Sequence, residues 1–226
     1  MKLPLLLVNF KAYEKSTGFN AVALAKIHDE VANETGLSIA IAVSAVDIKD
    51  VVAAVKIPVF AQHCDPVDFG ARTGFLPPKL LKSLGVSGTL LNHSEHQISD
   101  EVLQKSIEAA KAAGLFVIVC ANTPEKGADV VKFGPDLIAV EPPELIGGDI
   151  SVAKAKPDII VKSVELIGRD KVLVGAGVKN GEDTKIALEL GAQGILVASG
   201  VTNSPDPKKA ILDLVRPFAV GEHRPV

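Results

Sequence analysis

The stretch KVLVGAGVKNGEDTKIALELGAQGILVASG, residues 171–200, holds the pattern that decides the fold. Its two ends, 171–177 and 194–200, are continuous apolar runs that finish in small residues, whereas 180–191 has the spacing of a helix. Runs that are apolar at every position are typical of parallel strands buried on both faces. The stretch therefore predicts a strand, a helix and a second strand parallel to the first.

The same alternation runs through the whole chain. Eight apolar runs are candidate strands: 3–10, 38–44, 57–63, 88–94, 115–122, 136–142, 171–177 and 194–200. Helical patterns follow them, at 18–35, 46–55, 77–85, 99–114, 123–133, 156–168, 180–191 and 206–218. Eight strand-then-helix units in a row predict an α/β protein with a closed (β/α)8 barrel, the TIM barrel, of eight parallel strands. A doubly wound sheet is the alternative, but it usually has fewer strands, and no GxGxxG follows the first run.

Size and composition suit one globular domain. The chain has 226 residues, of which 47% are hydrophobic and 23% charged, and no linker or low-complexity segment divides it. We predict one catalytic domain over residues 1–226, with a flexible tail at 219–226. No signal peptide is recognisable, and no apolar stretch approaches the ~20 residues that span a bilayer. We therefore expect a cytoplasmic protein without a membrane partner.

Charge and residue types argue against several other classes of partner. Lys and Arg number 24 against 27 Asp and Glu, a net charge of −3, so nothing favours a nucleic-acid partner. Aromatic residues make up only 4%, too few for base-stacking platforms. The two cysteines, Cys64 and Cys120, lie in apolar runs without metal-ligand spacing, and we interpret them as buried free thiols.

Polar residues stand where the predicted strands end, and a (β/α)8 barrel builds its active site at that face. They are Asn9, Lys11, Gln62, His63, Asn92, His93, Ser94, Glu95 and Glu141, while the last two strands end in the small residues Gly175 to Gly177 and Ala198 to Gly200. Taken singly, Lys11 suits a snorkelling side chain, His93 a satisfied core histidine and Glu141 a solvated loop charge. Together, a carboxylate, an imidazole, an ammonium and an amide would converge on one mouth of the barrel.

The chemistry that suits these groups is proton abstraction next to a carbonyl. A carboxylate acts as the base, while an uncharged imidazole and an ammonium stabilise the oxygen of the developing enediolate. The small-residue ends of the last two strands would offer backbone N–H groups to a phosphate, which this fold often binds there.

At these residues the sequence resembles the triosephosphate isomerase family. The resemblance extends to about residue 218 and rests on ordered motifs: Asn9-Phe10-Lys11, Ala61-Gln62-His63, Gly70-Ala71-Arg72-Thr73-Gly74, His93-Ser94-Glu95, and Glu141-Pro142 followed by Ile146-Gly147. The short chain and the segment PPELIGG resemble the archaeal branch, which tends towards tetramers rather than dimers. The resemblance implies interconversion of dihydroxyacetone phosphate and D-glyceraldehyde 3-phosphate, without cofactor or metal, in glycolysis and gluconeogenesis.

The resemblance also implies a role for each site residue. Glu141 moves the proton between two substrate carbons, His93 shuttles protons between the oxygens, and Lys11 neutralises the enediolate while Asn9 helps to hold the substrate. Glu95 supports Lys11 without touching the substrate. Backbone N–H groups would hold the phosphate near Ile146, Gly147, Gly177, Ala198 and Ser199. Loop 68–75 would insert into a neighbouring subunit of a homo-oligomer, near that subunit's Lys11 and His93.

Several positions depart from the family's pattern. Gly177 stands where the family usually has a serine, so a hydroxyl contact to the phosphate is missing there. Glu144 replaces the bulky aromatic residue of many members, Gly148 and Asp149 form an unusual far hinge of the mobile lid, and His96 replaces the usual arginine or asparagine.

Two alternative functions stay open at this point. A sugar-phosphate epimerase usually needs metal ligands at several strand ends, but His63 and His93 are the only strand-end histidines and no paired aspartate accompanies them. A barrel that only binds a sugar phosphate, or serves as an assembly block, needs no base, so Lys11, His93 and Glu141 together argue against it.

Overall fold

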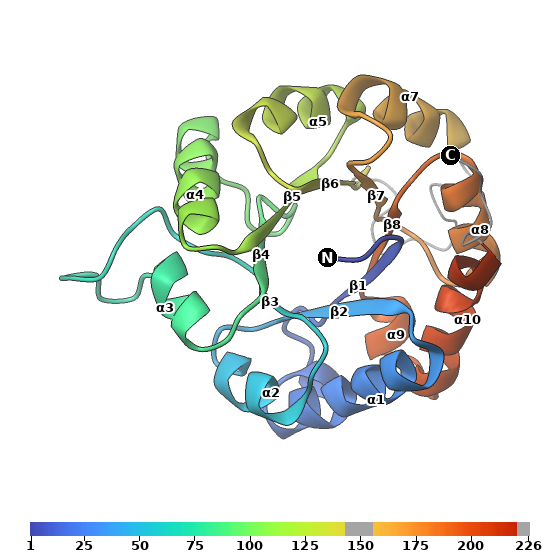
Figure 1. The fold of residues 1–226 in the computed structure, drawn as a ribbon, viewed down its shortest axis with the longest axis horizontal. Helices are drawn as coiled ribbons and strands as arrows, with labels where there is room; N and C mark the ends of the chain where they lie inside the picture. The colour runs from blue at the N-terminus through green and yellow to red at the C-terminus, as the bar shows by residue number, and fades with distance from the viewer. Residues whose placement is uncertain (143–155, 221–226) are drawn as a thin grey trace.

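The computed structural model describes residues 1–142 and 156–220, and eight parallel strands form a closed barrel in it (Figure 1). The strands are β1 (Leu5–Asn9), β2 (Ser38–Val43), β3 (Val59–Ala61), β4 (Gly88–Leu91), β5 (Phe116–Ala121), β6 (Leu137–Val140), β7 (Val172–Val174) and β8 (Gly194–Val197). Each strand pairs with the next one along the chain, and β8 pairs with β1 to close the barrel. The predicted (β/α)8 architecture is confirmed.

Helices form an outer ring around this barrel (Figure 1). They are α1 (Phe19–Thr35), α2 (Ile48–Ala54), α3 (Pro78–Ser83), α4 (Asp100–Ala112), α5 (Pro124–Val130), α7 (Pro157–Ile167), α8 (Gly181–Glu189), α9 (Ser199–Thr202) and α10 (Pro207–Val220), with short 3-10 turns η1 (Glu14–Ser16) and η2 (Val131–Phe133). Helix α10 takes up the first two residues of the segment predicted as a tail at 219–226, and 221–226 lie outside the described residues.

The helix boundaries follow from capping residues in the sequence. The Ser99 hydroxyl accepts a hydrogen bond from the backbone of α4, and the side chains of Thr123 and Asn180 do the same for α5 and α8. Such caps satisfy N–H groups that have no partner inside the helix. Helix α1 ends at Gly36, whose φ of 69° suits a residue without a Cβ atom.

Two apolar layers explain why the strands are apolar at every position. Alternate residues fill the barrel's interior, and they are Leu5, Leu7, Ala40, Ala42, Phe60, Leu90, Ile118, Cys120, Leu137, Ala139, Leu173 and Leu196. The residues between them, such as Leu6 and Val8, pack outward against the helices. Gly194 allows β8 to approach β1, because a Cβ atom there would lie 2.0 Å from the Leu5 carbonyl oxygen.

The predicted strands are longer than the real ones, most clearly at the C-terminal face. Strands β7 and β8 end at Val174 and Val197, so Gly175 to Gly177 and Ala198 to Gly200 are not strand residues. Ala176 and Gly177 have φ values of 68° and 70°, which no strand adopts, and Ser199 begins α9. Small apolar residues fit a strand pattern but also fit the turns that leave the barrel, so the prediction of these two strand ends was wrong.

Candidate active site

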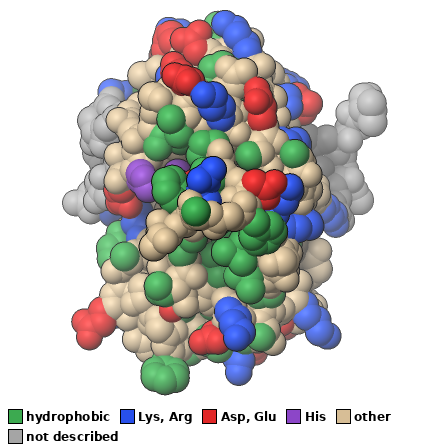
Figure 2. Space-filling model, turned by 90° about the vertical axis from the view of Figure 1, so that its left-hand side faces the viewer, with side chains coloured by type: hydrophobic (Ala, Val, Ile, Leu, Met, Phe, Trp, Pro, Cys, Tyr) green, Lys and Arg blue, Asp and Glu red, His purple; other side chains and the backbone are tan. Residues whose placement is uncertain are grey.

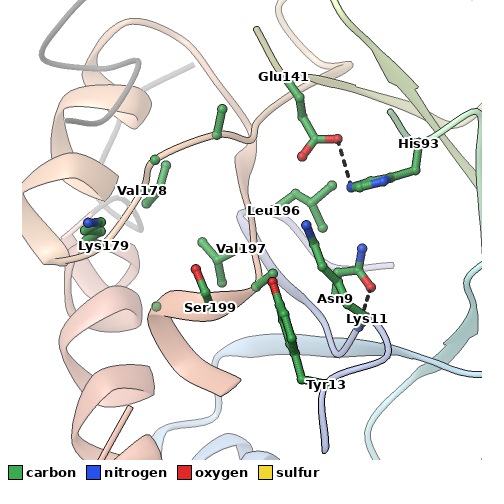
Figure 3. A pocket seen from close by; sticks show the side chains of 14 residues that line it. Asn9, Lys11, Tyr13, His93, Glu141, Val178, Lys179, Leu196, Val197 and Ser199 are labelled. Atoms are coloured by element: carbon green, nitrogen blue, oxygen red, sulfur yellow. Dashed lines mark hydrogen bonds and ion pairs between the residues drawn. The ribbon is translucent and has the colours of Figure 1, made fainter. Parts of the chain in front are cut away.

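A cavity opens where the strands end, and it gathers most of the predicted site residues (Figure 3). Its lining comprises Asn9, Lys11, Tyr13, His93, Glu141, Ala176, Gly177, Val178, Lys179, Leu196, Val197, Ala198, Ser199 and Gly200. The polar side chains of Asn9, Lys11, His93 and Glu141 thus share one cavity with the small residues after β7 and β8. Ile146 and Gly147, predicted to contribute N–H groups, lie outside the described residues.

Glu141 follows β6 and is buried, with its side chain only 7% exposed. Burial raises the pKa of its carboxyl group, and this outweighs the opposing effects of His93, a hydrogen bond from the Cys120 thiol, and Lys11. Its Oε2 atom is buried and has no hydrogen-bond partner among the described residues. A Cβ atom on Gly175 would lie 2.4 Å from Glu141 Cγ, so this glycine makes the room for the carboxylate.

His93 follows β4 and faces Glu141 across the cavity (Figure 3). Its Nδ1 atom accepts a hydrogen bond from the Glu95 backbone N–H at 3.2 Å. That contact assigns the ring proton of the neutral imidazole to Nε2. Nε2 lies 3.7 Å from Glu141 Oε2, longer than a hydrogen bond, so both atoms are available to a substrate that lies against the pair.

Neighbouring residues hold Lys11 in a backbone conformation that residues other than glycine rarely adopt, with φ of 51°. Its N–H donates to Asn9 Oδ1 at 3.0 Å, and its carbonyl oxygen accepts from Gln62 Nε2 at 3.0 Å. Its ammonium group lies 2.6 Å from Glu95 Oε1. Lys11 and Glu95 therefore form an ion pair.

Comparison with known proteins identifies the family of this chain. A sequence model described as triosephosphate isomerase matches residues 4–216. The chain belongs to the triosephosphate isomerase family. The triosephosphate isomerase of Methanobacterium bryantii is 44% identical over 216 residues, which cover 94% of this chain and 96% of that protein. The enzyme of Methanosarcina barkeri is 44% identical over 220 residues, covering 96% and 99%.

A solved triosephosphate isomerase structure agrees with the fold. The enzyme of Bartonella henselae has a TM-score of 0.70 to this chain and covers 97% of it, at 19% identity. The relatives above are archaeal and match nearly the full length of this short chain, so the predicted archaeal type is confirmed.

Backbone strain is concentrated around this cavity. Among residues 1–142 and 156–220, the non-glycine residues with positive φ are Lys11, Asn92 and Ala176, and each directly follows a strand or lies within two residues of its end. Such conformations cost free energy and persist where surrounding contacts enforce them. For Asn92 these contacts are hydrogen bonds from Nδ2 to the Cys120 carbonyl oxygen and from the Ile98 N–H to Oδ1.

From the sequence alone, no role in the site is assigned to three residues that contact it or line it. Gln62 donates to Asn9 Oδ1 at 3.2 Å as well as to Lys11, so one amide orients two site residues. Cys120 is a buried free thiol as predicted, yet it also contacts Glu141. Burial, and then the Glu141 charge, raises the pKa of this thiol well above its usual value. Tyr13 lines the cavity. Barrel closure and strand register create these contacts, which no pattern in one sequence encodes.

A second hollow lies on the other side of Lys11 and His93. It is lined by Asn9, Lys11, Ala12, Ser44, Ala45, Ala61, Gln62, His63, Leu76, Leu90, His93, Glu95 and His96. The His63 and His96 rings stack there, with centroids 4.4 Å apart, and burial is the main cause that lowers the pKa of His63. The loop between β3 and α3 projects from the barrel beside it (Figure 1) and exposes 61% of Phe69 and 49% of Phe75.

Two further observations bear on cofactors and membranes. Within residues 1–142 and 156–220, no three His, Cys, Asp or Glu side chains are grouped so that they could hold a metal ion. Over the same part of the chain, no helix has both the length and the apolar character needed to cross a membrane.

Proposed function

We propose that Glu141, His93 and Lys11 carry out the reaction of this family in this chain, the interconversion of dihydroxyacetone phosphate and D-glyceraldehyde 3-phosphate. As a triosephosphate isomerase the chain is an aldose–ketose isomerase that acts on a phosphorylated triose. The observation that carries the assignment is the pair formed by Glu141 Oε2, buried and without a partner among the described residues, and His93 Nε2, 3.7 Å away.

Glu141 is the proposed base. It removes a proton from the carbon next to the substrate's carbonyl group and returns it to the neighbouring carbon, which moves the carbonyl by one position. A raised carboxyl pKa makes the carboxylate a stronger base, while His93 and Lys11 favour its ionised form. Its lack of competing hydrogen bonds at Oε2 leaves that atom to the substrate.

His93 and Lys11 are the proposed partners of the substrate oxygens. The Nε2–H of neutral His93 donates to the carbonyl oxygen and passes protons between the two oxygens as the enediolate forms and collapses. The ammonium group of Lys11 lies near enough to lower the Glu141 pKa, so its charge reaches the same space. Asn9 uses Oδ1 for Lys11 and Gln62, which leaves its Nδ2 to donate to the substrate.

The phosphate group is proposed to lie at the opposite wall, near Gly177, Ala198 and Ser199. These residues line the cavity and have small or no side chains, so an anion can approach their backbone N–H groups. The further predicted contacts at Ile146 and Gly147 belong to the same proposal.

One assay tests these roles. We expect Glu141→Ala to lower the isomerisation rate of D-glyceraldehyde 3-phosphate, measured with a chelator present, by about 10²- to 10⁴-fold. Glu101→Ala is the matched control, because Glu101 is an exposed glutamate on α4 and should leave the rate unchanged. Full activity of Glu141→Ala would contradict the assignment of the base, and loss of wild-type activity in chelator would favour a metal-dependent epimerase.

Assembly into a homo-oligomer, a tetramer rather than a dimer, is part of this proposal. Figure 2 looks onto the side from which the loop before α3 projects, and hydrophobic side chains are spread over its middle. Insertion of loop 68–75 into the second hollow of a neighbouring subunit would cover Phe69 and Phe75 and enclose Lys11 and His93. Analytical ultracentrifugation at micromolar concentration tests it, and a fully active monomer would contradict it.

The place and extent of the enzyme complete the proposal. We place the reaction in the cytoplasm, in glycolysis and gluconeogenesis, and assign it to one catalytic domain over residues 1–226.

A further inference from the structure

Tyr13 is the one tyrosine of the chain, and it stands in the wall of the substrate cavity. Figure 3 shows its ring rising from the lower edge of the view with the hydroxyl group turned up into the cavity, beside Ser199 and below Glu141 and His93. In the stretches 1–142 and 156–220, no protein group is hydrogen-bonded to this hydroxyl. A donor therefore faces the cavity beside Ser199, one of the residues proposed to hold the phosphate.

The backbone that carries Tyr13 is fixed by neighbouring hydrogen bonds. Its carbonyl oxygen accepts from the Ser16 N–H at 2.9 Å, from Ser16 Oγ at 3.3 Å and from Thr17 Oγ1 at 3.1 Å. Ser16 Oγ also donates to the Phe10 carbonyl oxygen at 2.5 Å, which ties this turn to the end of β1. A side chain on such a turn loses little conformational freedom when it binds a ligand.

This end of the cavity lacks one hydroxyl that the family usually provides. Gly177 has no side chain at the position where the family usually has a serine, so the turn after β7 offers the phosphate only its backbone. A phenol has one O–H donor, and a hydrogen bond to a charged phosphate oxygen is stronger than one between neutral groups. Tyr13 follows Lys11 by two residues, so one turn can hold both ends of the substrate.

We propose that the Tyr13 hydroxyl donates a hydrogen bond to the phosphate group of the substrate and replaces the serine hydroxyl that Gly177 lacks. This inference rests on the proposed function, which puts the phosphate between Gly177, Ala198 and Ser199. The phosphate keeps its charge throughout the reaction, so the contact is made equally in the ground state and the transition state. A contact of that kind lowers KM and leaves kcat nearly unchanged.

Tyr13→Phe tests the proposal, because it removes the hydroxyl and keeps the ring. We expect KM for D-glyceraldehyde 3-phosphate and the inhibition constant of inorganic phosphate both to rise about tenfold or more, the loss typical of one hydrogen bond to a charged group. With D-glyceraldehyde, which has no phosphate, kcat/KM should stay at the wild-type value.

Thr17→Val is the matched control, since it removes a hydroxyl that holds the same turn but does not line the cavity. It should leave both constants unchanged. Unchanged constants in Tyr13→Phe, an equal loss with D-glyceraldehyde, or the same loss in Thr17→Val would each overturn the proposal. Wild-type enzyme that isomerises the substrate but is not inhibited by phosphate would overturn the phosphate placement itself, and the inference with it.

Discussion

The two sides of the cavity mouth are built from opposite kinds of structure. Strands β1, β3, β4 and β6 end in polar side chains whose positions are set by hydrogen bonds or close packing, and these are Asn9, Lys11, Gln62, His93 and Glu141. Strands β7 and β8 are followed by glycine, alanine and serine residues, with backbone close to the cavity. Proton transfer needs groups of set position and pKa, whereas holding an anion needs backbone that a ligand can approach.

This difference predicts that a structural change of equal size lowers kcat more on the polar side of the mouth than on the small-residue side. Among variants that keep every catalytic side chain, the largest effect on catalysis is expected for Gly175→Ala. A Cβ atom there would lie 2.4 Å from Glu141 Cγ, so the carboxylate must move. Displacement of a reacting group by about 1 Å costs roughly 10²-fold in rate, and we expect kcat to fall by about that factor or more.

Gly127→Ala is the control for this variant. Its Cβ atom would lie 2.4 Å from Ile167 Cδ1, an equally short contact outside the cavity. It should lower the melting temperature without a comparable loss of kcat. Equal kcat in the two variants would show that the position of Glu141 is not limiting.

The next largest effect is on the free energy of unfolding. It involves a histidine that is buried behind the polar side of the mouth. His28 is buried, packs on Phe10 with ring centroids 5.3 Å apart, and has a pKa lowered to about 4 by burial. Between pH 6.5 and 4 the unfolded chain binds this proton and the folded chain does not, so the free energy of unfolding falls as the pH drops through that window. A difference of about 2.5 pKa units corresponds to about 3 kcal/mol.

Denaturant unfolding at fixed protein concentration, at pH 7 and pH 4, measures this effect. His28→Leu replaces the titrating group with an apolar side chain of similar size. The free energy of unfolding of this variant should therefore fall less between pH 7 and pH 4 than that of the wild type. The same pH dependence in the wild type and the variant would contradict the assignment to His28.

A smaller effect is expected for Gln62→Leu, which removes the amide that orients Asn9 and Lys11. Each lost hydrogen bond is worth about 0.5–1.5 kcal/mol, so kcat/KM should fall about tenfold. Gln104→Leu is the control, because the Gln104 amide is exposed on α4 and donates to Glu108 Oε1 at 3.0 Å, away from the cavity. If kcat/KM of Gln62→Leu equals that of Gln104→Leu, Lys11 keeps its conformation without the hydrogen bond from Gln62.

The smallest effect should come from the small-residue side. Gly177→Ala puts a Cβ atom on a residue with φ of 70°, and this costs about 1–2 kcal/mol of stability. We expect KM to rise a few-fold with kcat nearly unchanged. Gly36→Ala has the same strain, with φ of 69° and open space around it, and should lower stability alone. A fall in kcat for Gly177→Ala as large as that for Gly175→Ala would erase the distinction between the two sides.

The sequence alone predicts the barrel and the convergence of Lys11, His93 and Glu141, because the order of apolar runs sets the strand order and parallel strands end at one face. It does not predict the Cys120 contact to Glu141 or the double role of Gln62. Those contacts depend on register, with Cys120 paired to Ala139 two positions before Glu141. The ends of β7 and β8 were also missed, since small residues suit both a strand and the turn that leaves it.

The most direct test of the central claim is proton exchange at the substrate carbon. Wild-type enzyme in D2O should convert D-glyceraldehyde 3-phosphate into dihydroxyacetone phosphate that partly carries deuterium, as measured by NMR. In Glu141→Gln, isomerisation and deuterium incorporation should both fall by about 10²- to 10⁴-fold, while the inhibition constant of inorganic phosphate stays within about twofold. Wild-type deuterium incorporation in Glu141→Gln would contradict the assignment of proton transfer to Glu141.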